Sequence, residues 1–144
     1  MLKLVATEKS DLSQLQEWVA ADPWHKENET WKKTEGMLTG NGILAFNVSD
    51  DKGPVVYIRL DKEDDLARIA TQFAPESEVS KRRLVVGLAR IGIPAMIEFA
   101  KQNGYKGLIF ESISPTLIGF GDRFGFRSVG NNDYALIFEE QQNV

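Results

Sequence analysis

The chain of 144 residues is 42% hydrophobic and 26% charged, and its 17 basic and 21 acidic residues give a net charge of −4. This length and composition predict one folded domain over residues 1–144 and exclude a disordered chain. The acidic balance disfavours nucleic acid as a partner. Because cysteine is absent, disulfides, thiolate metal sites and a cysteine nucleophile are excluded.

Metal and membrane binding are also disfavoured. His25 is the only histidine, so the sequence lacks the repeated imidazole ligands of many metal sites and predicts no bound metal. The first residues, MLKLVATEKSD, contain no uninterrupted apolar stretch, and no later segment has the length of a membrane span. We therefore expect a soluble, cytoplasmic protein with no membrane partner.

The first elements in chain order are an edge strand and an amphipathic helix. Residues 2–8, LKLVATE, alternate between apolar and polar side chains, which predicts the strand. Residues 10–22, SDLSQLQEWVAAD, predict the helix. Ser10 or Asp11 is expected to cap its start, with Gln14 in the capping-box position three residues after Asp11.

The next part of the chain predicts a short helix followed by three antiparallel strands. Asp and Gly in the segment DDKG, between two runs rich in β-branched and aromatic residues, predict a hairpin turn. The expected elements are a helix over residues 28–38 and strands over residues 43–49, 54–61 and 65–75.

A long helix is expected over residues 77–104, because apolar residues recur there at spacings of three, four and seven. Gly104 stands where a helix C-cap belongs. Pro94 lies inside the pattern and lacks a backbone N–H, so we expect a bend or break between Arg90 and Pro94.

The last third of the chain predicts a buried strand, a short helix and a final hairpin. The strand is expected over residues 105–114, the helix over 114–125 and the hairpin over 124–140, around the turn GNND. Gly125, just past the short helix, suits the left-handed cap, and Phe126 can anchor the next strand in the core.

This order of elements, over nearly the whole chain, resembles the GNAT superfamily, the GCN5-related N-acetyltransferases. The segment SPTLIGFGDRFGFRSV is similar to the closing motif of that family, in which a short helix starts at Asn or Ser and ends in Gly-Phe before the last hairpin. The positions that fit the motif are Ser114, Leu117, Ile118, Phe120, Arg123, Gly125 and Phe126. The segment ESISPTLIGF is also similar to segments of small GNAT-like proteins of bacteriophages and bacteria.

The resemblance implies an α+β fold of three layers. Its mixed, mostly antiparallel central sheet would have six or seven strands with a splay at the centre, flanked by about four helices. It also implies acetyl-CoA as cosubstrate and transfer of the acetyl group, by direct attack, to an amine of a small molecule or protein. In the family, the pyrophosphate lies on the N-terminus of the helix after the fourth strand.

Two registers are open for the phosphate-binding residues. In the first, the segment LVVGLA aligns with the family's phosphate loop, so that Gly87 and Ala89 fit while Leu84 departs from the usual Gln or Arg. In the second, Ser80 caps the helix and Lys81, Arg82 and Arg83 occupy its first turn. Basic side chains there oppose the helix dipole unless an anion is bound. A solvated basic turn is the equally weighted alternative.

In the family, catalysis needs a polarised acetyl carbonyl, a neutral amine and a proton for the leaving thiolate. This sequence lacks the usual donor of that proton. Backbone N–H groups near Phe73 and Ala74 would polarise the acetyl carbonyl, and Glu111 or Glu76 would act as base. The Tyr that protonates the leaving thiolate is replaced by Gly121.

Two serines are candidates for the missing hydroxyl. Ser112 and Ser114 would lie near the sulfur, although Ser114 is also the natural N-cap of the short helix. Simple surface and capping roles are the favoured alternative for these serines and for the carboxylates named above.

The segment ADPWHKENETW is the candidate acceptor site, since the family uses the segment between its first two helices for this purpose. Trp24, His25 and Trp31 would line it, with an imidazole able to titrate near neutrality. The simpler alternative is that the two tryptophans pack in the core at a bend of the chain.

Two rival functions remain open alongside the enzyme. The first is a GNAT-fold binding or structural protein that has lost the chemistry, and the second is an acyl-CoA-binding regulator. The sequence is compatible with a monomer or a homodimer.

Overall fold

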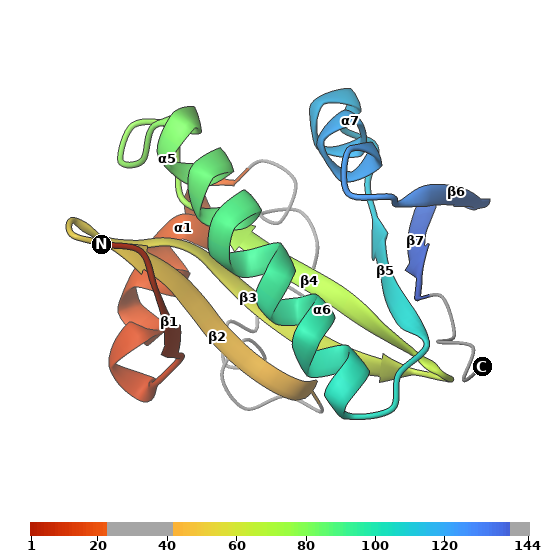
Figure 1. Ribbon diagram of the computed structural model, residues 1–144. Coiled ribbons are helices and arrows are strands. Elements are labelled where there is room, and N and C mark those ends of the chain that lie inside the picture. The colour runs from red at the N-terminus through yellow and green to blue at the C-terminus, as the bar shows by residue number, and fades with distance from the viewer. Residues whose placement is uncertain (23–41, 139–144) are drawn as a thin grey trace. The chain divides into compact units, whose positions relative to one another are not determined.

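The computed structural model describes residues 1–22 and 42–138 (Figure 1). Its strands are β1 (Lys3–Ala6), β2 (Gly42–Asp50), β3 (Gly53–Glu63), β4 (Leu66–Phe73), β5 (Gly107–Glu111), β6 (Arg127–Gly130) and β7 (Asp133–Ile137). Its helical segments are η1 (Lys9–Asp11), α1 (Leu12–Ala21), α5 (Lys81–Gly87), η2 (Leu88–Gly92), α6 (Ile93–Gln102) and α7 (Pro115–Asp122). The helix expected over residues 28–38 lies outside the described residues.

The strands form one seven-stranded sheet in the order β1-β2-β3-β4-β5-β7-β6. Pairing is antiparallel between β1 and β2, β2 and β3, β5 and β7, and β6 and β7. It is parallel between β4 and β5, where the register runs from Leu66 with Gly107 to Arg68 with Ile109. The mixed, mostly antiparallel sheet and the edge position of β1 are therefore confirmed. The expected splay beyond this pairing stays a prediction.

The described ranges contain three helices rather than about four: α1, the continuous run of α5, η2 and α6, and α7. Within these ranges, no helix combines the length and the apolar character needed to cross a membrane.

The chain divides into two compact units. Unit 1 consists of Met1–Asp61 and Ala70–Ala95, and unit 2 consists of Lys62–Ile69 and Met96–Val144. The division falls inside β3, inside β4 and inside α6. A single domain over residues 1–144 stays a prediction.

In unit 1, helices cover both faces of the sheet (Figure 1). Trp18 of α1 packs edge-on against Tyr57 of β3, with ring centroids 5.1 Å apart, and both side chains are buried. On the other face, a Cβ added to Gly87 of α5 would lie 3.3 Å from Val48 of β2. Tyr57 pairs with Asn47, the neighbour of Val48, so strand alternation directs Tyr57 and Val48 to opposite faces. The expected three layers are present in this unit.

The start of α1 corrects one prediction. The chain enters the helix through the short turn η1, and the carboxylate of Asp11 accepts the backbone N–H of Glu8 at 2.8 Å. Asp11 also accepts the hydroxyl proton of Tyr57 at 2.8 Å, and the side chain of Gln14 lies against the same hydroxyl. Asp11 is the N-cap residue of α1, but its side chain makes no capping bond to that helix. The expected capping box between Asp11 and Gln14 is therefore wrong: Asp11 bonds Glu8 and the phenol of Tyr57, and Gln14 bonds the same phenol.

The long helix is interrupted just before Pro94, as the sequence predicted. Residues Leu88–Gly92 form one wide π turn, in which the N–H of Ile93 donates to the carbonyl of Leu88, five residues earlier. Pro94 has no N–H with which to continue the α-helical pattern, and the wider turn absorbs this loss.

Unit 2 contains the Gly-Phe closure. α7 begins at the N-cap Ser114, whose hydroxyl oxygen accepts the N–H of Leu117 at 3.3 Å. Past its end, Gly125 adopts a left-handed φ of 99°, and the N–H of Phe126 donates to the carbonyl of Gly121. Phe126 is buried and packs edge-on against Phe110 of β5. Both expected roles of the Gly-Phe pair, the helix cap and the core anchor, are confirmed.

Candidate functional site

The N-terminus of α5, in unit 1, is the first part of the candidate site. Ser80 is its N-cap, and the hydroxyl oxygen of Ser80 accepts the N–H of Arg83 at 3.2 Å. The first turn therefore carries Lys81, Arg82 and Arg83 and contains no acidic residue. Lys81 and Arg82 are exposed, whereas Arg83 is half-buried. The helix start agrees with the second of the two registers expected from the sequence.

The residues of the first register lie further along the helix. Gly87 is the last residue of α5 and is buried, and Ala89 follows in η2. A Cβ on Gly87 would lie 3.1 Å from Cγ2 of Val55 and 3.3 Å from Cγ1 of Val48. The small size of Gly87 is therefore explained by close packing of the helix on the sheet. Gly87 and Ala89 both lie away from the N-terminus of α5. Their contacts with a cofactor stay a prediction.

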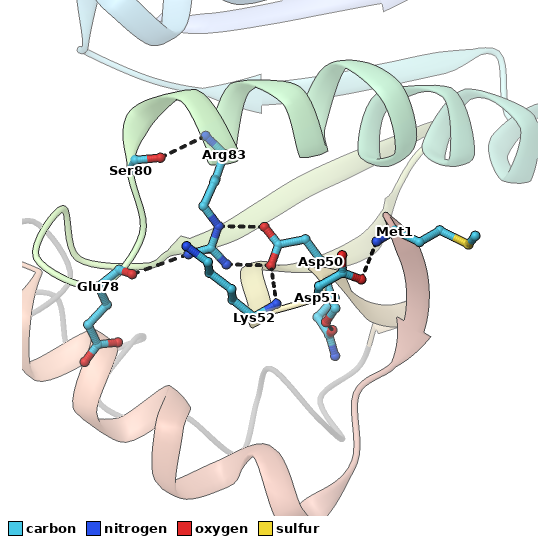
Figure 2. A network of polar contacts seen from close by, with 9 residues as sticks. Met1, Asp50, Asp51, Lys52, Glu78, Ser80 and Arg83 are labelled. Atoms are coloured by element: carbon cyan, nitrogen blue, oxygen red, sulfur yellow. Dashed lines mark hydrogen bonds and ion pairs between the residues drawn. The ribbon is translucent and has the colours of Figure 1, made fainter.

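Arg83 is held by an acidic partner (Figure 2). Its Nε donates to Oδ2 of Asp50 at 2.6 Å, and its Nη2 donates to Oδ1 at 2.5 Å. Nη1 also donates to the backbone carbonyl of Glu78 at 3.5 Å. The side chains of Arg83 and Asp50 are only 22% and 19% exposed. The guanidinium thus forms a bidentate, partly shielded ion pair, which is a strong geometry for an Arg–carboxylate contact.

This pairing changes the ionisation of both partners. Hydrogen bonding from Arg83 lowers the pKa of Asp50 from its ordinary 3.8 to about 2, helped by the backbone N–H of Lys52 and opposed by burial. The same hydrogen bond raises the pKa of Arg83. Both groups are charged at neutral pH.

We expect Asp50→Asn to lower the free energy of unfolding at pH 7 by about 1 kcal/mol, since the pair is partly exposed to solvent. The pKa of Asp50 is lower in the folded protein than in the unfolded chain, so its contribution is complete above about pH 4. It is lost as the pH falls towards about 2. Urea unfolding of both proteins between pH 2 and pH 7 checks this.

The neighbouring Asp51, whose side chain is 84% exposed, provides the control for this experiment. Asp51→Asn should change the pH profile much less than Asp50→Asn does. A constant difference between wild type and Asp50→Asn at all pH values would contradict the assigned ion pair.

The end of β4, also in unit 1, is the second part of the site. The N–H of Ala74 donates to the carbonyl of Val55 in β3 at 3.4 Å. Adjacent residues of a strand direct their N–H groups to opposite edges, so the N–H of Phe73 points to the edge away from β3. The N–H of Ala74 is therefore engaged within the sheet, and the role of Phe73 and Ala74 in polarising an acetyl carbonyl stays a prediction.

A buried glutamine supports this end of β4. Gln72 is fully buried, and its Nε2 donates to the carbonyl of Phe73 at 3.0 Å and to Oδ2 of Asp22 at 3.2 Å. The side chain of Gln72 thus fixes the peptide that follows Phe73. The sequence analysis missed this role, which depends on the long-range contact with Asp22.

The loop between β4 and α5, residues 74–80, is anchored to α1. Nε1 of Trp18 donates to the carboxylate of Glu78 at 2.8 Å. The carbonyl of Pro75 accepts the N–H groups of Glu78 and Val79 at 2.9 and 3.0 Å, and Val79 is buried. Glu76, one of the expected bases, is exposed in this loop.

In unit 2, the expected catalytic residues follow one another at the end of β5. Glu111 is exposed. Ser112 is buried, and its hydroxyl oxygen accepts the N–H of Ser114 at 3.0 Å. Ser112 and Ser114 therefore each satisfy a backbone N–H at the start of α7. The capping role of Ser114 is confirmed, and the catalytic roles of all three residues stay predictions.

Gly121, the position where the resemblance led us to expect a tyrosine, is packed against an aromatic ring. A Cβ there would lie 3.0 and 3.1 Å from Cζ and Cε1 of Phe110. Phe110 is itself stacked on Tyr134 with ring centroids 5.6 Å apart. The loss of the tyrosine is thus matched by a core that fills the space beside Gly121.

The remaining candidates lie elsewhere in the chain. Trp24, His25 and Trp31 fall outside the described residues, so their acceptor role stays a prediction. In the described part of the chain, no group of three His, Cys, Asp or Glu residues is placed to hold a metal ion.

The fold can be compared with known proteins. No model of a protein family and no curated protein matches the sequence. Solved structures do match, including a GNAT-family acetyltransferase from Staphylococcus aureus Mu50, with a TM-score of 0.73 at 13% identity over 96% of this chain and 100% of the other. The ribosomal-protein-S18-alanine N-acetyltransferase of Escherichia coli matches with a TM-score of 0.69 at 16% identity over 100% and 99% of the two chains.

A third match is a GNAT-family acetyltransferase from Brucella melitensis, solved in complex with acetyl-CoA. Its TM-score is 0.64 at 13% identity, over 97% of this chain and 90% of the other. The chain therefore has the GNAT fold, and the resemblance expected from the sequence is confirmed at the level of the fold.

Proposed function

We propose that the protein is an acetyl-CoA-dependent N-acetyltransferase acting on an amine of a small molecule or protein. The observation that carries this proposal is the start of α5, where Ser80 caps the helix and Lys81 and Arg82 are exposed in a first turn without acidic residues. Free backbone N–H groups at a helix start, together with cations in its first turn, favour a bound anion. The fold is that of acetyltransferases, one of which was solved with acetyl-CoA.

Each part of the reaction has a candidate residue. When bound, acetyl-CoA supplies a thioester that the amine attacks directly, forming a C–N bond while the C–S bond breaks and CoA leaves. Lys81 and Arg82 would hold the phosphates, and the N–H of Phe73 would donate to the acetyl oxygen. Glu111 would take the proton that the amine loses.

The leaving thiolate needs a proton from a source other than residue 121. Ser112 and Ser114 each accept a backbone N–H but keep their own hydroxyl proton. A thiol has a pKa of about 8.5, so the thiolate also takes a proton from solvent near neutral pH. The absence of the tyrosine would therefore slow the reaction without preventing it.

A GNAT-fold protein without catalysis is the second candidate. It is favoured by Gly121, because the ring of Phe110 lies where a side chain of residue 121 would begin. Such a protein would retain the fold and turn over no amine.

We expect acetyl-CoA at 100 times its Kd to stabilise the wild type by about 2.7 kcal/mol in thermal unfolding. Lys81→Gln combined with Arg82→Gln should weaken the affinity by about tenfold or more, because two phosphate contacts are lost. Calorimetry with acetyl-CoA and CoA measures the affinity, and release of the CoA thiol in the presence of a panel of amines measures transfer.

Arg90→Gln is the matched control, since it removes one exposed cation of the same helical run outside the first turn. It should leave the affinity unchanged. If neither acetyl-CoA nor CoA binds at millimolar concentration, the enzyme proposal is wrong. Binding without thiol release for any amine would favour the second candidate.

A further inference from the structure

Arg83 differs from the two other cations of its helical turn, because its side chain is already occupied. The guanidinium joins two segments that lie far from each other in the sequence, as Figure 2 shows. It binds both carboxylate oxygens of Asp50, the last residue of β2 before the turn to β3, and the carbonyl of Glu78, in the loop before α5. Its backbone N–H completes the cap with Ser80.

The turn that receives Arg83 is itself fixed. Asp50 pairs with Gly53 across the hairpin, and Oδ1 of Asp50 also accepts the backbone N–H of Lys52 at 2.9 Å. The adjacent Asp51 bonds the amino group of Met1, at the start of the chain. The carboxylate of Asp50 is thus oriented by its own turn as well as by Arg83.

The loop that Arg83 contacts is held from a second side. The carboxylate of Glu78 accepts the indole N–H of Trp18, a side chain only 1% exposed that packs on Tyr57. The main chain of Glu78 is therefore fastened to the hairpin through Arg83, while its side chain is fastened to α1. The two attachments together hold the loop that leads into α5.

We infer that Arg83 is a positioning residue, which fastens residues 74–80 and the first turn of α5 to the β2–β3 turn so that Lys81 and Arg82 face an incoming phosphate. The inference rests on the proposed function for its ligand. It assigns Arg83 a different role from its neighbours Lys81 and Arg82. Arg83 would have to give up a bidentate carboxylate to bind a phosphate directly, whereas Lys81 and Arg82 are exposed.

Substitution of Asp50 separates positioning from direct binding, because the two roles predict opposite results. If Arg83 positions the loop, Asp50→Asn releases it and weakens CoA affinity, by about tenfold for the loss of one charged pair. If Arg83 binds phosphate, Asp50→Asn frees the guanidinium and removes a nearby negative charge, so the affinity stays equal or rises. Calorimetry with CoA, at a temperature where every variant is folded, decides between them.

A double-mutant cycle with Arg83→Gln adds a second criterion. Positioning through one ion pair predicts that Asp50→Asn, Arg83→Gln and the double variant lose similar affinity, since each breaks the same contact. Arg82→Gln should lose affinity without loosening the loop, and Arg90→Gln should change neither. Additive losses from Asp50→Asn and Arg83→Gln would overturn the inference.

Amide hydrogen exchange of residues 74–80 tests the fastening without any ligand. Exchange should accelerate by about tenfold in Asp50→Asn and in Arg83→Gln, and should stay unchanged in Arg82→Gln. If the wild type binds no CoA, the proposed function fails, while faster exchange in these two variants still supports the fastening. Unchanged exchange in both variants would contradict it, whatever the affinity for CoA.

Discussion

Gly107→Ala should destabilise unit 2 by about 3 kcal/mol or more. Gly107 is the first residue of β5 and pairs with Ile137 of β7 and with Leu66 of β4. A Cβ there would lie 2.3 Å from the backbone oxygen of Leu136 and 3.1 Å from Cα of Ile137. Both obstacles are main-chain atoms, so the clash is relieved only by moving the strand and breaking its pairing.

Urea unfolding of unit 2, followed by hydrogen exchange along β5 and β7, measures this effect. Gly119→Ala is the matched control, because a Cβ at this helical position of α7 meets nothing within 4 Å. That variant should gain about 0.5–1 kcal/mol from the better helix propensity of alanine. Equal effects of the two substitutions would show that the close approach at Gly107 is absent.

Gly121→Tyr should cost about 3 kcal/mol of stability, although it restores the residue of the family motif. The first added carbon already lies 3.0 Å from the ring of Phe110, and that ring is held by Phe126 on one side and Tyr134 on another. The phenol therefore enters an occupied core. We expect no increase in the rate of thiol release, because a strained side chain cannot reach a defined catalytic geometry.

The coupling to Phe110 makes this expectation specific. Gly121→Tyr should cost less in a Phe110→Ala background, where the obstructing ring is gone, than in the wild type. Denaturant unfolding of the four proteins of this cycle gives the coupling directly. Equal costs in the two backgrounds would mean that Phe110 does not exclude a side chain at residue 121.

Local sequence patterns predicted much of this fold because their causes are local. Gly125 follows a short helix and takes the left-handed conformation that a residue with a Cβ resists. Ser114 caps that helix, and Pro94 follows an interruption in the long one. Each feature depends on residues only a few positions away, so one segment was enough to predict it.

Contacts between residues far apart in the sequence could not be predicted. Arg83 and Asp50 are 33 residues apart, and nothing near either residue indicates the other. The helix start at Lys81 could be predicted from Ser80, but the difference between Arg83 and Arg82 could not. The prediction of a capping box at the start of α1 was wrong for the same reason, since Asp11 bonds a tyrosine 46 residues away.

The candidate chemistry was predicted only in part. The resemblance placed Gly121 where active members of the family carry a tyrosine, but the crowding of that position by the ring of Phe110 comes from packing between β5 and α7. Ala74 was named with Phe73 as an N–H donor, and only the pairing of β4 with β3 separates them. Spacing along one chain does not specify which edge of a strand a given N–H faces.

The division of the chain inside β3, β4 and α6 has a consequence for how the protein is made. The backbone passes between the two units after Asp61, after Ile69 and after Ala95, so no single cut separates them. During synthesis, the residues of unit 1 are complete only once Ala95 has left the ribosome, and Leu66–Arg68 of unit 2 can pair with β5 only after Gly107–Ile109 have followed. A truncation after Ala95 would leave residues 62–69 without β5, exposing an unpaired strand edge of the kind that promotes aggregation.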